Sequence, residues 1–113
     1  MNRTGERAPG YDAPQRPDRS QRAGQTIVDA IRRVHPEGAG GVLDYAALTH
    51  FHGDHMGTLM PDSPAAKSGA YKLTGITDVG DALPIRTLLD RDWPDYNYPA
   101  PSGGAMMLNY RAF

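Results

Sequence analysis

The residues of this chain that could do chemistry lie in one short segment, residues 49–57, which reads THFHGDHMG. Of the chain's 4 histidines, all but one fall in this segment, together with one aspartate. Neutral imidazoles and a carboxylate are ligands that zinc, iron and manganese accept in proteins. The segment therefore predicts a metal site with the ligands His50, His52, Asp54 and His55.

Spacing within the segment supports this prediction. A His-x-His pair at the end of a strand directs two imidazoles to the same side, because strand side chains alternate with a period of two. Gly53 and Gly57 would permit tight turns and close approach of the backbone beside the metal. Thr49 would support the ligands through a hydrogen bond within the loop. A metal held here would lower the pKa of a bound water from about 15.7 to about 7, making hydroxide available at neutral pH.

The elements before and after the segment must position it. Residues 43–48 predict a short buried strand that leads into the histidines, and residues 54–60 predict a short helix after the ligand-bearing loop. An earlier helix is predicted with Thr26 as its N-cap and Asp29 in the manner of a capping box. Its apolar face would carry Ile27, Ala30, Ile31 and Val34.

The second half of the chain gives weaker signals. Residues 70–74 could form a strand, residues 76–83 are ambiguous because Gly80 interrupts them, and residues 85–90 predict a further strand. From Trp93 onwards the chain reads as a loop-rich tail, in which residues 93–96 pack against the domain and residues 106–108 form an exposed apolar end.

Composition limits the function classes. A chain of 113 residues holds one small domain, and its net charge of -1 gives no overall basic field for nucleic acid or an anionic membrane. We expect residues 1–24, rich in arginine and proline, to be a disordered tail before a domain at residues 25–113. No membrane span or signal sequence is read, which favours the cytoplasm. The absence of cysteine excludes a disulfide framework and a thiolate metal site.

The motif T-H-x-H-x-D-H-x-G resembles the metal-binding motif of the metallo-β-lactamase superfamily. Over residues 24–100 the chain is similar to the metallo-hydrolases related to the competence proteins of DNA uptake. The similar stretches are Gly24-Gln25-Thr26, Leu43-Asp44-Tyr45, the histidine run, residues 75–81, residues 88–91 and Pro94-Asp95-Tyr96. The resemblance implies an α/β fold, part of the superfamily's αββα sandwich.

The resemblance also implies roles for single residues. His50 and His52 would bind one metal, Asp54 and His55 a second, and Asp54 would be catalytic because it also orients the attacking water. The implied function is hydrolysis of an ester, amide or phosphodiester by metal-bound hydroxide, with one or two Zn²⁺ ions, or manganese or iron. The substrate, a small molecule or a phosphodiester, cannot be read from the sequence, and neither can the oligomeric state.

Two parts of the family pattern are missing from this sequence. The pair of strands expected before the first helix is replaced by the arginine- and proline-rich tail, and no histidine follows His55. None of the downstream aspartates matches the family's bridging ligand. We therefore expect an N-terminal fragment with negligible hydrolysis on its own. The alternative is a non-catalytic remnant that binds metal weakly or not at all. A third reading is a site shared by two chains, completed by His35, although His35 is expected to face solvent.

Overall fold

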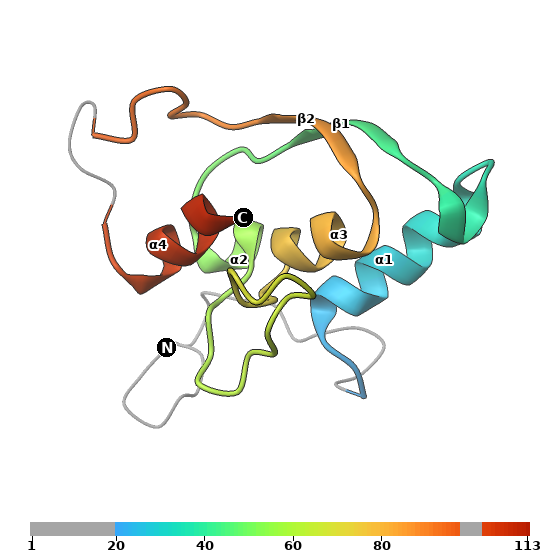
Figure 1. Ribbon diagram of the computed structural model, residues 1–113, viewed down its shortest axis with the longest axis horizontal. Coiled ribbons are helices and arrows are strands. Elements are labelled where there is room, and N and C mark those ends of the chain that lie inside the picture. Colours follow the sequence, from blue (N-terminus) through green and yellow to red (C-terminus); the bar gives the residue numbers. More distant parts are fainter. Residues whose placement is uncertain (1–19, 98–102) are drawn as a thin grey trace.

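Two parallel strands, β1 (Leu43–Ala47) and β2 (Ile85–Leu89), form the only sheet within residues 20–97 and 103–113, the part that this computed structural model describes. Four helices accompany them: α1 (Ala23–Val34), α2 (Gly53–Met56), α3 (Ile76–Ala82) and α4 (Ala105–Ala112), with a short 3-10 helix at Gly38–Gly40. Figure 1 shows the helices on one side of the two strands, with α1 and α4 at opposite ends. The fold over this part is mixed α/β, as predicted.

The strands bring distant parts of the chain to one edge of the sheet. Leu43 pairs with Ile85 and Ala47 with Leu89, and the amide of Leu48 donates to the carbonyl of Leu89 at 2.8 Å. Because the strands are parallel, both carboxyl ends lie at the same edge. The histidine segment after β1 and the residues after β2 therefore leave the sheet side by side.

The strand predictions for residues 43–48 and 85–90 are confirmed, but the expectation that the first strand is buried is wrong. Tyr45 is 74% exposed, and Leu89 on β2 is 55% exposed. Parallel sheets are usually covered on both faces. Here the helices cover one side only (Figure 1), so these side chains contact solvent.

Helix α1 begins at Ala23, with Arg22 as its N-cap, and not after Thr26 as predicted. The guanidinium of Arg22 pairs with the carboxylate of Asp78, which joins the start of α1 to α3. Residues 23 and 24, assigned to the tail, therefore belong to the helix, while residues 1–19 lie outside the described residues. The Thr26 hydroxyl accepts a hydrogen bond from Gln21 at 3.0 Å and caps nothing.

The predicted apolar face of this helix is also wrong. Ile27 and Val34 are 48% and 82% exposed, whereas Gly24 and Val28 are buried. Glycine at position 24 explains the rotation: a Cβ there would lie 2.3 Å from Asp78 Oδ2, so α1 and α3 approach closely along this line. Packing against α3 has overridden the pattern of apolar residues.

The second half contains two helices that local signals did not establish. Of the ambiguous residues 76–83, Ile76–Ala82 form α3, and α4 occupies part of the predicted loop-rich tail. Within residues 106–108, Leu108 is 70% exposed, but Met107 is buried, which corrects the prediction of an exposed apolar end. Residues 70–74 form no strand; Lys72 makes an isolated bridge with Ala65.

A small core joins α2 and α4 beneath the histidine segment. Its buried members are Leu48, Met56, Met107 and Tyr110. Val28 on α1, Val79 on α3 and Leu83 just after it are also buried, and α1 packs against α3. Within the described ranges, no helix has the length and apolar character needed to cross a bilayer.

Candidate metal centre

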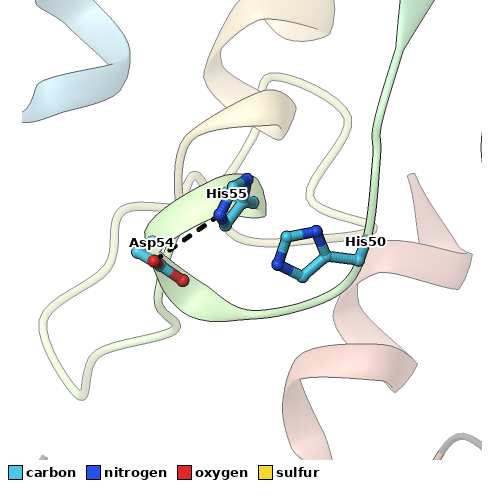
Figure 2. Close-up of side chains that lie close together, drawn as sticks. All are labelled: His50, Asp54 and His55. Carbon is cyan, nitrogen blue, oxygen red and sulfur yellow. Dashed lines mark ion pairs between the residues drawn. The ribbon is translucent and has the colours of Figure 1, made fainter. Parts of the chain in front are cut away.

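Three of the four predicted ligands come together at the carboxyl end of β1. One nitrogen each of His50 and His55 and one carboxylate oxygen of Asp54 all lie within 4.8 Å of one another. We call these three residues the histidine cluster. Figure 2 shows His50 reaching from the loop after β1 toward Asp54 and His55, which both project from α2. The rings of His50 and His55 have centroids 3.7 Å apart, and Asp54 Oδ2 lies 3.6 Å from His55 Nε2.

The short helix α2 explains how adjacent residues reach His50. The carbonyl of His52 accepts hydrogen bonds from the amides of His55 and Met56, both at 2.9 Å, and so begins the turn. Met56 ends the helix with its side chain buried in the core. This helix is shorter than the predicted one over residues 54–60, because Gly57 leaves the helical conformation with φ +94°.

Both glycines of the segment lie close to other parts of the chain. A Cβ at Gly57 would lie 2.0 Å from the carbonyl oxygen of Thr74, and a positive φ disfavours any other residue there. A Cβ at Gly53 would lie 2.3 Å from the hydroxyl of Thr58. Gly57 also bridges to Gly75 at the start of α3, which ties the end of the histidine segment to that helix.

Thr49 contacts both histidines of the cluster. Its hydroxyl lies 3.1 Å from Nδ1 of His50 and 3.4 Å from Nδ1 of His55. A hydroxyl can donate to one of these nitrogens and accept from the other. The ring from which it accepts carries its proton on Nδ1, which leaves Nε2 of that ring unprotonated and able to bind a metal.

The charge environment also favours ligation by His50. Partial desolvation, followed by the neighbouring His55 and His52, lowers the pKa of His50 from its ordinary value of 6.5. A metal ligand must be the neutral imidazole. The lowered pKa therefore keeps His50 in its ligating form at neutral pH.

His52 differs from the other predicted ligands. Its side chain is exposed, and its ring meets that of His50 edge-on with centroids 4.8 Å apart. It is not part of the group of three. The structure thus groups His50 with Asp54 and His55, whereas the family resemblance pairs His50 with His52.

His35 has a structural role of its own. Its Nε2 lies 3.1 Å from the carbonyl of Val42, and its Nδ1 accepts the amide of Glu37 at 3.1 Å. The ring is half-buried against Gly41, where a Cβ would come within 2.5 Å of Nδ1. The expectation of a solvent-facing His35 is therefore wrong, and both ring nitrogens are already engaged. This removes the support for a site completed by His35 of a second chain.

A groove of about 420 Å³ lies elsewhere, where α1 meets α3. Its lining includes Arg22, Arg32, Lys67, Asp78 and Asp81, and none of the histidines. The histidine cluster is instead a surface site, since Asp54 and His55 are exposed. A ligand bound at the cluster would be open to solvent.

Sequence reasoning did not predict that Asp90 would lie at the same edge of the sheet as the histidine segment. It follows β2 directly, at the sheet edge where the histidine segment leaves β1. Its position after a strand parallel to β1 is the signal that could have found it.

Comparison with known proteins identifies no relative: no family model matches the chain, and neither a curated protein nor a solved structure matches it. Function must therefore be inferred from the residues and their arrangement.

Proposed function

We propose that this protein is a metal-dependent hydrolase of the metallo-β-lactamase superfamily, with its metal held by His50, Asp54 and His55. The observation that carries the proposal is the approach of three ligating atoms to within 4.8 Å of one another. Two nitrogens and one carboxylate oxygen suit Zn²⁺, and the same donors suit iron and manganese.

Three protein ligands leave positions on a metal ion open, as in catalytic rather than structural zinc sites. A bound divalent ion would supply hydroxide at neutral pH for attack on an ester, amide or phosphodiester. His50 and His55 would hold the ion as neutral imidazoles, with Thr49 at their Nδ1 atoms. Asp54 has two carboxylate oxygens, so one can bind while the other accepts a proton from the attacking water.

A second candidate function, metal binding without catalysis, is favoured by the exposure of the cluster. Active sites gain from excluding water, because electrostatic interactions strengthen in a dry site. Asp54 and His55 are exposed, and the groove near α1 and α3 does not reach them. The two candidates agree on the ligands and differ on turnover.

Zinc titration of the full chain by calorimetry tests the ligands. We expect one ion per chain, and a loss of affinity of about 100-fold or more in His50→Ala, Asp54→Ala and His55→Ala. His52→Ala should lose less, because His52 lies outside the group of three. An equal loss in His52→Ala would support the two-metal arrangement that the family resemblance implies.

Turnover decides between the two candidates. The zinc-loaded chain is assayed with an activated phosphodiester and a lactone, with Asp54→Asn as the matched variant. Hydrolysis that requires zinc and falls in Asp54→Asn would support the hydrolase. Zinc binding with no turnover above that of free zinc would favour metal binding without catalysis.

A further inference from the structure

One carboxylate at the end of β2 accepts four hydrogen bonds. Oδ2 of Asp90 accepts the hydroxyls of Tyr96 and Tyr110 at 2.6 and 2.7 Å. Its Oδ1 accepts the amides of Asp92 and Trp93 at 3.0 and 2.8 Å. Both oxygens are thus engaged by donors of the chain itself. Asp90 is therefore held as a structural acceptor and not presented as a metal ligand.

The two tyrosines pack around the residue between His50 and His52. The ring centroid of Phe51 lies 5.3 Å from that of Tyr110 and 6.1 Å from that of Tyr96. We call Phe51, Tyr96, Tyr110 and Asp90 the aromatic cluster. Tyr110, on α4, is only 4% exposed and belongs to the core.

The backbone on either side of Phe51 is fixed by further contacts. The amide of Leu48 donates to the carbonyl of Leu89, so the segment before the histidines is joined to the residue before Asp90. A side chain of α4 reaches the other end of the segment: Met106 Cε lies 3.7 Å from where a Cβ of Gly53 would be. Contacts with β2 and α4 thus lie on both sides of the stretch that carries His50.

We infer that Asp90 is a positioning residue, which acts through Tyr96 and Tyr110 to hold Phe51 and so place His50 for metal binding. This inference rests on the proposed metal site. A metal-binding side chain on a flexible loop loses conformational entropy when the metal binds. A side chain on an ordered loop has already lost that entropy during folding. Partners of metal ligands typically change metal affinity by about 10- to 100-fold when removed.

Three variants of the full chain test this inference: Tyr96→Phe, Tyr110→Phe and Asp90→Asn. The tyrosine variants remove one hydroxyl and keep the ring that packs on Phe51. Tyr45→Phe is the matched control, because Tyr45 lies on β1 and is 74% exposed. Zn²⁺ affinity is measured by competition with a chromogenic chelator, well below each variant's unfolding temperature, and Co²⁺ absorption reports the ligand set.

We expect Tyr110→Phe and Asp90→Asn to weaken Zn²⁺ binding by about 10-fold, the lower end of the range for direct partners of a ligand, because they act on His50 through Phe51, and Tyr96→Phe to act in the same direction. The Co²⁺ band positions should stay unchanged, because the ligands are the same, and the control should bind as the unaltered chain does. Unchanged affinity in the folded Tyr→Phe variants would overturn the inference. Shifted Co²⁺ bands in Asp90→Asn would make Asp90 a ligand and overturn it as well.

A measurement without metal separates this inference from the proposed function. Backbone ¹⁵N relaxation of the metal-free chain should show increased motion at His50 to His52 in Tyr110→Phe but not in Tyr45→Phe. Relaxation that is the same in both variants would contradict the positioning role, whatever the metal results. An unaltered chain that binds no metal would overturn the proposed function, and the role in metal binding with it.

Discussion

The histidine cluster and the aromatic cluster share one stretch of chain but are held very differently. His50 and His55 have the hydroxyl of Thr49 within hydrogen-bond distance, at 3.1 and 3.4 Å, and both Asp54 and His55 are exposed. Phe51 packs on two tyrosines whose hydroxyls share a carboxylate with two backbone amides. Reactive side chains on a surface loop are useful only where a rigid scaffold positions them. The side chains that could bind a metal therefore depend on neighbouring side chains that bind none.

The largest expected effect comes from emptying the aromatic cluster. Tyr110→Ala should lower the free energy of unfolding by about 3–5 kcal/mol, because it leaves a cavity in the core and removes a hydrogen bond to Asp90. Urea unfolding of the metal-free chain measures it. Tyr45→Ala, on an exposed position of β1, should change stability by under about 1 kcal/mol. Equal losses of unfolding free energy in Tyr110→Ala and Tyr45→Ala would contradict the stabilising role of the aromatic cluster.

Gly57→Ala tests the close contact at the end of the histidine segment. We expect a loss of about 2 kcal/mol or more, because the position has φ +94° and the added Cβ meets the carbonyl of Thr74. Gly69→Ala is the matched control: φ there is +76°, but nothing lies within 4 Å of the added Cβ. Chemical denaturation of both variants separates the contact with Thr74 from the backbone conformation. If Gly57→Ala lost no more unfolding free energy than Gly69→Ala, the close approach of Gly57 to the carbonyl of Thr74 would be contradicted.

The aromatic cluster should also reveal itself at high pH. Desolvation and the hydrogen bond to Asp90 raise the pKa of Tyr96 to about 12 from an ordinary value of 10.0. The folded state therefore keeps this proton where the unfolded state loses it. The contribution of the protonated Tyr96 hydroxyl to the free energy of unfolding is complete below pH 10. Between pH 10 and 12 this contribution decreases by about 1–2 kcal/mol.

Unfolding free energies measured at pH 9, 10, 11 and 12 check this decline. Tyr96→Phe should reduce this decrease in unfolding free energy with pH, whereas Tyr45→Phe should leave it as in the unaltered chain. The same dependence of unfolding free energy on pH in all three proteins would contradict the hydrogen bond from Tyr96 to Asp90 in the folded state.

The smallest change in stability is expected at the histidine cluster. Asp54→Asn and His55→Gln should alter the unfolding free energy of the metal-free chain by less than about 0.5 kcal/mol, because both side chains are exposed. Zinc at about 100 times its dissociation constant should stabilise the unaltered chain by about 2.7 kcal/mol. Thermal unfolding with and without zinc should show this gain reduced or lost in the variants. A large loss of unfolding free energy in these variants without metal would mean that the histidine cluster has a structural role.

Local sequence signals predicted the parts of this fold that depend on local chemistry. Both strands appeared where short apolar runs predicted them, and the motif named the three residues that meet in the cluster. The face of α1 was mispredicted because it is set by Gly24 against Asp78, far along the chain.

The same reasoning explains why α4 and Asp90 were missed. Residues 105–112 follow two glycines and carry little amphipathic pattern, so their helix depends on packing against the core. The partners of Asp90 include Tyr110, which is separated from it by a stretch that reads as a loop. Contacts of this kind are visible only when the chain is folded.

The parallel pairing of β1 and β2 has a consequence for how the protein is made. Leu43 can find Ile85 only after all the intervening chain has left the ribosome, and parallel pairing of distant segments is slow to form. The histidine segment is synthesised before its supports at Leu89 and Tyr110. A metal ion present during synthesis would thus meet the ligands before the scaffold that orders them exists.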